Sequence, residues 1–268
     1  PRNNSTVGDS HGYPLPFNNQ KEKTMKKRIL GIIIPIIACA VLFAQAEPER
    51  IHSIFYMKAK NGKEDQLEKG MANHILKFHS DGKWPEYVHE VIAGEKTGQF
   101  FHFTSPHRWV DFDNRVRSAK DVKDWQMNLL PYVDENSSSF QTSYVAYMPE
   151  LSLPYEANFN MYRVTYFYVR PGKDADFTYF IGKANESHIK LKDGHKHHFY
   201  RTVMGGEGGV YASVHPLDKF EGMYEMGSSM RKAFGEKEVK RLQNIFSGAV
   251  KKTTSELRKV RPDLSSKN

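Results

Sequence analysis

The sequence predicts an α+β protein built from two copies of a β-α-β-β-α-β unit. Three observations lead to this prediction. A segment starting at Ile54 aligns with one starting at Val164, at an offset of 110 residues. After a glycine, each segment changes from a period-two to a helical pattern of apolar residues. Aromatic residues make up 13% and charged residues 26% of the 268-residue chain, a composition typical of folded globular proteins.

The two copies keep one register over most of their length. Residues 54–65 align with residues 164–175, and one small adjustment is needed near Gly94 and Gly205. Further matched pairs are Leu67 with Phe177, Met71 with Ile181, Gly98 with Gly208 and Pro106 with Pro216. A register of this length indicates an internal duplication.

Each copy is expected to open with a strand and a helix. Residues 51–59 and 161–169 alternate in side-chain character, which favours strands, and a glycine turn follows each. The helix after the turn carries one apolar stripe. The stripe consists of Leu67, Met71, Ile75 and Phe78 in copy one, and of Phe177, Ile181, Asn185 and His188 in copy two.

Two strands, a second helix and a last strand complete each copy. Ser105-Pro106 is expected to begin the second helix of copy one, as N-cap and first helical residue. The glycine-rich run 204–209 joins two strands, so we expect a hairpin turn there and not a phosphate-binding loop. The remaining expected elements are strands 87–93, 99–104 and 140–148, strands 199–204, 209–214 and 253–260, and an amphipathic helix over 237–252.

The order β-α-β-β-α-β is that of the ferredoxin-like split unit. The pattern Tyr-x5-Gly-Lys-acidic, which starts at Tyr56 and again at Tyr166, resembles the dimeric α/β-barrel superfamily, and within it the NIPSNAP and antibiotic-biosynthesis-monooxygenase-like members. The resemblance covers most of residues 50–262. It implies that the two repeats pack sheet against sheet, as a pseudo-symmetric dimeric-α/β-barrel unit formed by one chain, or that two chains associate.

The residues themselves also favour a second sheet. Tyr166 and Tyr168 lie on one face of their predicted strand, and Phe167 lies on the other. A sheet with large apolar or aromatic groups on both faces is buried on both faces. One face is covered by the helices of the repeat, so the other needs a partner sheet.

The N-terminal part is expected to be removed. Residues 1–24 form an upstream non-native or disordered segment, and residues 25–46 have the order of a secretory signal peptide, from Lys26-Lys27-Arg28 to Ala44-Gln45-Ala46. The apolar run 29–43 is shorter than a bilayer span, so the mature protein is expected to have no integral membrane span. Membrane anchoring and lipidation at Cys39 are the alternatives. The protein is therefore expected to be exported, as a periplasmic or secreted protein.

The predicted mature chain comprises repeat 1 at 47–150, a linker at 151–158 and repeat 2 at 159–268. Removal of residues 1–46 lowers the formal net charge from +8 to +4. Because no basic stripe remains, nucleic acid is not expected as a partner. The single cysteine excludes an intramolecular disulfide framework and a Cys-rich metal site.

Candidate ligand-binding residues fall on the helices and on the strands. His188 and Asn185 place polar groups on the apolar stripe of copy two, where a core position needs a partner or a ligand, and His74 stands beside the stripe of copy one. His52, His89, Tyr56 and Tyr166 lie on strands and are expected to face a cavity between sheet and helices. A satisfied core histidine is the competing interpretation for each histidine.

No catalytic residue, cofactor or metal is predicted. The run His195-Lys196-His197-His198 follows a turn and is interpreted as a solvated turn, with weak transition-metal binding as the alternative. Haem-degrading members of the superfamily use an Asn, Trp and His set, which has no match here although Asn73 precedes His74.

The sequence favours an exported protein that binds a small hydrophobic or aromatic ligand between the sheet and helices of one repeat. A cofactor-independent monooxygenase or related small-molecule enzyme, and a cell-envelope module without a ligand, are the two alternatives. The copies differ at Ile75 against Asn185 and at Phe78 against His188. This divergence predicts a polar working pocket in copy two and a filled core in copy one.

Overall fold

The structure is a computed structural model in which residues 50–136, 141–156, 159–221 and 229–267 are described. The expected signal peptide and the segment before it lie outside these residues. Within the described residues, no helix is both long enough and apolar enough to cross a bilayer.

Each repeat folds in the predicted order of elements, except that two helices stand where one second helix was predicted. The first repeat contains β1 (Ile51–Met57), α2 (Glu64–Phe78), β2 (Glu86–Ala93), β3 (Phe100–Thr104), α3 (Trp109–Asp113), α4 (Ala119–Asn128) and β4 (Ser143–Tyr147). The second contains β5 (Met161–Val169), α5 (Asp174–Leu191), β6 (His198–Met204), β7 (Val210–Leu217), α6 (Ser229–Phe234), α7 (Glu236–Ala249) and β8 (Val250–Val260). Short 3-10 turns, η1 (Leu130–Tyr132), η2 (Pro149–Leu151) and η4 (Pro262–Leu264), complete the described elements.

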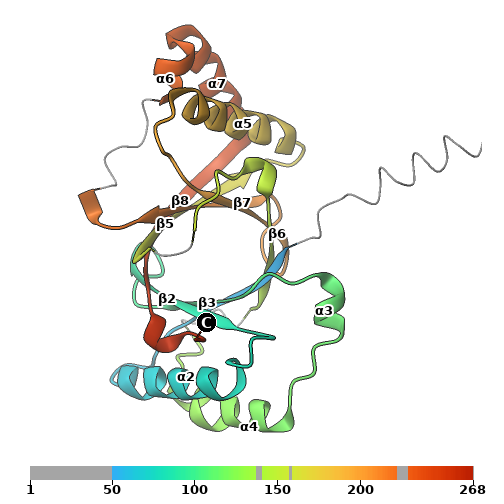
Figure 1. Cartoon of the computed structure of the whole chain (residues 1–268), viewed down its shortest axis with the longest axis vertical. Coiled ribbons are helices and arrows are strands. Elements are labelled where there is room, and N and C mark those ends of the chain that lie inside the picture. The colour runs from blue at the N-terminus through green and yellow to red at the C-terminus, as the bar shows by residue number, and fades with distance from the viewer. Residues whose placement is uncertain (1–49, 137–140, 157–158, 222–228, 268) are drawn as a thin grey trace, which may run out of the picture. The chain divides into compact units, whose positions relative to one another are not determined.

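The eight strands form one closed antiparallel barrel in the order β1-β3-β2-β8-β5-β7-β6-β4 (Figure 1). Each repeat contributes four consecutive strands of this ring. The ring closes where β2 pairs with β8 and where β4 pairs with β6. Closure removes the open strand edges that a single ferredoxin-like sheet would expose. The expected pairing of the two repeats within one chain is therefore confirmed.

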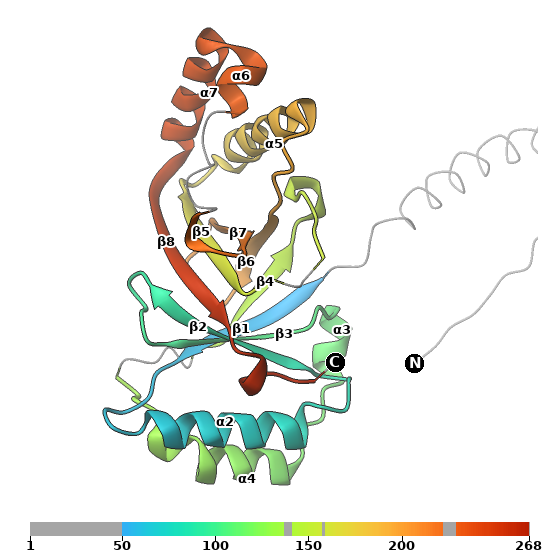
Figure 2. The same ribbon diagram turned by 60° about the vertical axis from the view of Figure 1, so that its left-hand side comes forward.

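Helices cover the outer faces of the two halves of the barrel, α2 and α4 on one side and α5 and α7 on the other (Figure 2). Beneath α2, Met57 packs with Leu67 and Met71 in one core. Beneath α5, Val169 and Phe177 belong to a second core. Alternation along β1 therefore turns Met57 toward the helices and Tyr56 into the barrel, where it packs with Val91 and Phe101.

Two element boundaries differ from the prediction for physical reasons. The second helix of the first repeat does not begin at Ser105-Pro106, because His107 exchanges two backbone hydrogen bonds with Ile51 and keeps the chain extended; α3 begins at Trp109. The last helix ends at Ala249 and not at residue 252, since Val250 and Lys252 already pair with β5.

The glycine-rich run is the predicted hairpin turn between β6 and β7. Gly205 has a φ of +81°, and a Cβ there would lie 2.3 Å from the carbonyl oxygen of Thr142. The repeat offset rises from 110 for β1 and β5 to 111 for β2 with β6 and for β3 with β7, so the one extra residue of the second repeat lies between β5 and β6.

A buried polar cluster connects the two repeats inside the barrel. The hydroxyls of Tyr56 and Tyr166, which occupy equivalent positions, lie 2.7 Å apart. Glu256 accepts a hydrogen bond from Tyr56 at 2.8 Å, and Arg258 forms an ion pair with Glu256 and hydrogen bonds to both phenols. Arg258 also lies over the Phe101 ring, 3.4 Å from its centroid. Every charged group of the cluster therefore has a partner.

Replacing Arg258 with Met should destabilise the protein by about 3–5 kcal/mol, because it leaves the Glu256 carboxylate buried without its cation. The double variant Glu256→Gln/Arg258→Met should recover part of this loss, since no charge then remains unpaired. Denaturant unfolding measures both values. The exposed ion pair of Arg241 with Glu238 provides the control, because Arg241→Met should cost less than about 1 kcal/mol. An equal, small effect of Arg258→Met and Arg241→Met would contradict a structural role for the cluster.

Candidate functional site

The two repeats differ in the side chains that line the space between each sheet and its helices. In the second repeat this space is a cavity of about 440 Å³. One part of its wall is apolar and aromatic, with Phe167, Ile181, Phe199 and Phe246. The other part carries the polar groups Arg163, Asn185, His188, His195, His197 and His215. Such a combination of apolar wall and few polar groups is typical of small-molecule sites.

Two histidines of the loop between α5 and β6 meet a third from β7 on the polar side. His195 lies in the loop after α5, His197 directly precedes β6, and His215 lies on β7. One ring nitrogen from each lies within 4.8 Å of the other two. The interpretation of this run as a solvated turn is wrong for His197, which is 4% exposed and whose backbone pairs with Leu153.

Burial controls the charge of these imidazoles. Burial lowers the pKa of His195 and of His197 to about 4, with the neighbouring histidines adding to the effect. Burial lowers the pKa of His215 further, to about 2, and the charges of His197, His195 and Arg163 act in the same direction. At neutral pH the three rings are therefore uncharged and keep one nitrogen lone pair each.

The structure places both predicted helix residues of the second repeat at this cavity. The Nδ1 atom of His188 lies 2.8 Å from the Asp193 carboxylate, and its ring stacks on His195 with centroids 3.9 Å apart. The Asn185 amide donates to the Leu151 carbonyl at 2.9 Å. Leu151 belongs to the second core, so the expected linker packs against this repeat from its first residue.

Several buried polar atoms at this cavity have no hydrogen-bond partner among the described residues. They are Nε of Arg163, Oδ1 of Asn185, Nδ1 of His197 and Nδ1 of His215. Elsewhere among the described residues, only His89, His102 and Asp121 have buried side-chain polar atoms without a hydrogen-bond partner. Unpaired buried polar atoms are costly, and their collection around one cavity indicates where a polar ligand would be stabilised.

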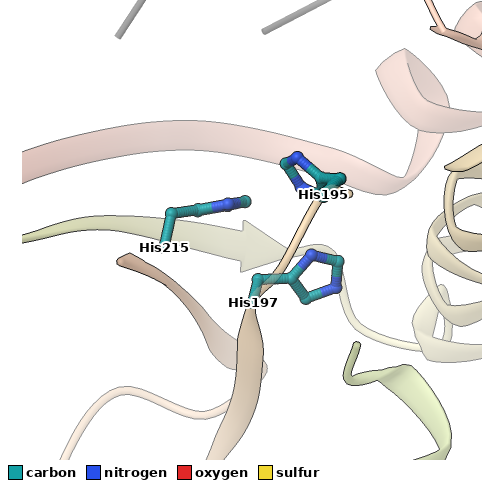
Figure 3. A group of neighbouring side chains, drawn as sticks. All are labelled: His195, His197 and His215. Carbon is teal, nitrogen blue, oxygen red and sulfur yellow. The ribbon is translucent and has the colours of Figure 1, made fainter. Parts of the chain in front are cut away.

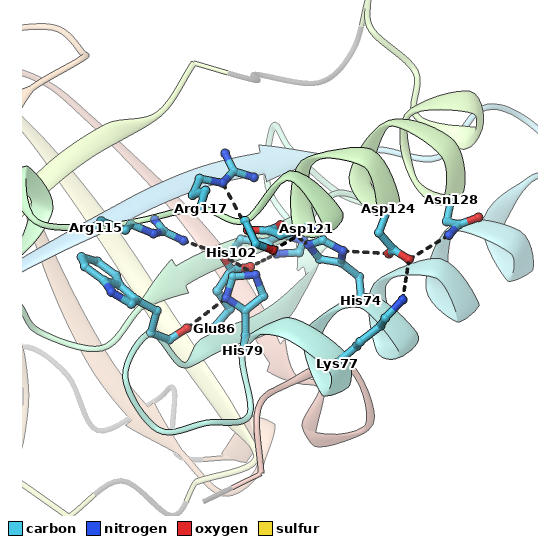
Figure 4. A network of polar contacts seen from close by, with 12 residues as sticks. His74, Lys77, His79, Glu86, His102, Arg115, Arg117, Asp121, Asp124 and Asn128 are labelled. Atoms are coloured by element: carbon cyan, nitrogen blue, oxygen red, sulfur yellow. Dashed lines mark hydrogen bonds and ion pairs between the residues drawn. The ribbon is translucent and has the colours of Figure 1, made fainter.

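The first repeat also has a cavity of about 440 Å³ at the equivalent place, so the expectation of a filled core there is wrong. His74 is 1% exposed and lies 2.9 Å from Asp124 and 3.4 Å from Asp121. His79 lies 3.7 Å from Glu86, and Figure 4 shows these groups joined in one network with arginines. His74 is therefore a core histidine with carboxylate partners, although both ring nitrogens of His102 and Oδ1 of Asp121 have no hydrogen-bond partner among the described residues.

The four strand candidates face the barrel interior and not the space beneath the helices, so that expectation is wrong. His52 and His89 line a cavity of about 950 Å³ at one end of the barrel. Tyr56 and Tyr166 line a cavity of about 230 Å³ at the other end. The side-chain alternation of β1 and β5 was predicted correctly, but the sequence did not show which of the two faces would turn inward.

Arg163 and His215 were not among the residues predicted from the sequence. Both lie on strands that pair with each other, and both point toward the helices. An arginine between Tyr162 and Val164, in a strand predicted to be buried on both faces, was the available signal. By strand register, Ser53 and Thr104 take the places of Arg163 and His215 in the first repeat.

Comparisons with known proteins support the fold. In sequence, the chain matches no family model and no curated protein. Among solved structures, it is similar to an anthrone oxidase-like protein (12% identity, TM-score 0.52, 80% of this chain and 92% of that chain). It is also similar to a mutant chlorite dismutase from Candidatus Nitrospira defluvii (8% identity, TM-score 0.52, 81% and 93%) and to a candidate monooxygenase from Lactobacillus acidophilus (10%, 0.52, 81% and 96%).

These similarities establish the architecture of this chain as the duplicated ferredoxin-like form of the dimeric α/β barrel. The expected fold class is therefore confirmed at that level. The sequence identities are low, so the chemistry of the site has to be argued from its own residues.

The histidines buried inside the barrel should make stability fall in acid. Burial, helped by Arg258, lowers the pKa of His89 to about 3, so below pH 6.5 the unfolded chain binds a proton that the folded chain does not. Between pH 6.5 and 3, the unfolding free energy of the wild type should fall more steeply than that of His89→Phe, by about 1.4 kcal/mol per pH unit. Urea unfolding across this range measures the difference. Parallel curves for the two proteins would contradict a neutral, buried His89.

Proposed function

We propose that the protein binds a small, partly aromatic anion in the cavity between the sheet and helices of the second repeat. The observation that carries this proposal is the set of unpaired buried polar atoms around that cavity, with Arg163 among them. No carboxylate lies within ion-pair distance of Arg163 among the residues that the structure describes. A half-buried guanidinium without a counter-ion favours a ligand that brings a negative charge.

The apolar part of the wall defines the rest of the ligand. Phe167 lies edge-on to Phe246, with ring centroids 6.1 Å apart, and stacks with Phe199 at 6.0 Å. Aromatic walls of this kind favour a flat apolar body by offset or edge contacts. A ligand with an aromatic ring at one end and an acidic group at the other would contact both the phenylalanines and Arg163.

Haem fits this donor set poorly. A porphyrin occupies four coplanar positions of its iron and leaves two axial positions on opposite sides. Here three imidazole nitrogens lie within 4.8 Å of one another, one more than the two axial positions can take (Figure 3). The site therefore favours a ligand smaller than haem.

Two further parts of the proposal come from the sequence. Export follows from the signal-peptide pattern of residues 25–46, and intact-mass measurement of protein from the cell envelope would test it by showing a chain that begins at Glu47. A NIPSNAP-like binding protein and a monooxygenase-like enzyme differ in turnover. Saturable binding without oxygen uptake supports the former, and oxygen consumption with the bound ligand supports the latter.

The ligand class can be tested with 2-naphthoate and the uncharged 2-naphthalenemethanol, which share the ring system and differ in the acidic group. Arg163→Met should weaken 2-naphthoate binding about ten-fold or more, because the charge pair is lost while the aliphatic stem stays. Binding of the alcohol should change little. Isothermal titration calorimetry measures both affinities.

Two control variants make this test specific. Ala184→Phe, on the α5 wall of the cavity, should weaken binding of both probes by filling the space they need. Arg241→Met removes an exposed arginine and should change neither affinity. Binding of 2-naphthoate that is unaffected by both Arg163→Met and Ala184→Phe would place the ligand elsewhere and overturn the proposal. Absence of binding by any anionic aromatic probe would do the same.

A further inference from the structure

The three converging histidines of the second repeat have the arrangement of a metal-ligand set. His195 and His197 are two residues apart in the loop before β6, and the pairing of β6 with β7 brings His215 to them. We infer that His195, His197 and His215 bind one divalent first-row transition-metal ion. This inference deepens the proposed function and rests on it, because the metal would occupy the polar end of the same cavity.

The hydrogen bond of His197 fixes the tautomer that a metal needs, and that of His215 allows it. Nε2 of His197 lies 3.0 Å from the Leu151 carbonyl oxygen, to which it can only donate, and this leaves Nδ1 with a free lone pair. Nε2 of His215 lies 2.8 Å from the Ser213 hydroxyl, and its Nδ1 also has no partner. A ring N–H held by a backbone carbonyl or hydroxyl is the usual support for a histidine that ligates through its other nitrogen.

The third ring is held by packing. His195 stacks on His188, and His188 in turn lies against the Asp193 carboxylate, which also accepts from the Ser229 hydroxyl at 2.7 Å. This chain of contacts places a negative charge behind the histidines without putting it among the ligand atoms. It would offset part of the charge of a bound cation.

The protonation state agrees with this role. Metal binding requires neutral imidazoles, and burial lowers the pKa of all three rings far enough that no proton has to be displaced near pH 7. The nitrogens lie within 4.8 Å of one another, whereas ligands about 2.1 Å from a tetrahedral zinc are about 3.4 Å apart. We therefore expect the rings to close slightly around the ion.

The rival cluster in the first repeat is a weaker candidate. His74, His79 and Asp121 also bring ligand atoms within 4.8 Å of one another. However, His74 is already held between Asp121 and Asp124, and Nδ1 of His79 lies 3.0 Å from the Trp84 carbonyl. A metal would have to displace ion pairs there, whereas Nδ1 of His197 and Nδ1 of His215 have no hydrogen bond among the described residues that a metal would break.

Three neutral ligands leave a divalent ion with its full charge and at least one open position. Arg163 lies beside His215 on the paired strand and adds a further positive charge. An anionic group on the ligand would neutralise both, by binding the metal directly and by pairing with the guanidinium. The metal and the acidic end of the proposed ligand should therefore bind cooperatively.

The test uses the full chain, stripped of metal with a chelator, and zinc chloride as the probe. Calorimetry should show one zinc ion per chain at the high-affinity site, and cobalt substitution should give the absorption of a four-coordinate site. His197→Gln and His215→Gln should each weaken zinc binding at least about ten-fold. The matched control is His79→Gln in the first repeat, which should leave zinc affinity unchanged, and thermal unfolding establishes that each variant is folded.

The outcomes separate the two proposals. Zinc binding that is lost in His79→Gln but kept in His215→Gln, or absence of tight zinc binding, overturns the metal inference. Binding of 2-naphthoate to metal-free protein in an Arg163-dependent way would then leave the proposed function standing. Tight zinc binding without any binding of 2-naphthoate would support the metal inference and overturn the proposed function. If both proposals hold, zinc should raise the affinity for 2-naphthoate about ten-fold or more.

Discussion

Closure of the barrel on its own pseudo-twofold axis is the constraint on which the rest of the structure depends. Tyr56 and Tyr166 meet there as equivalent residues of the two repeats, 2.7 Å apart, and Arg258 with Glu256 fills the space beside them. Because strands β4 and β8 each pair with both repeats, neither sheet keeps an open edge. The inner faces of the two sheets therefore hold the repeats together. Cavities of about 950 and 230 Å³ remain at the two ends of the barrel.

Because the inner faces hold the repeats together, the residues of the outer, helix-covered faces can differ between the repeats. In the first repeat, Glu86 and the aspartates of α4 lie within ion-pair distance of His79 and His74. In the second, strand register places His197 where Glu86 stands and His215 where Thr104 stands. The carboxylate is absent, so the second cavity keeps unpaired imidazoles and an arginine. The same fold therefore holds ion-paired histidines in the first repeat and a site with unpaired polar groups in the second.

Much of the fold could be predicted because each repeat carries its own local signals. Strand alternation, the glycine turn before each first helix and the 110-residue offset predicted the element order and the pairing of the two halves. The starts of α3 and β8 could not be predicted, since they depend on pairing of His107 with Ile51 and of Val250 with Val169. His188 and Asn185 were found through the contrast between repeats. Convergence of His195, His197 and His215, and the burial of Arg163, depend on sheet register, which the sequence did not specify.

The central claim is that the cavity beneath α5 and α7, and not the larger barrel interior, is the working site of this protein. A crystal structure with 6-bromo-2-naphthoate, with bromine located by anomalous scattering, tests the claim most directly. We expect one bromine site among Phe167, Phe199 and Phe246, with the carboxylate directed toward Arg163. A bromine site inside the barrel, beside Tyr87 and Tyr162, would contradict the account.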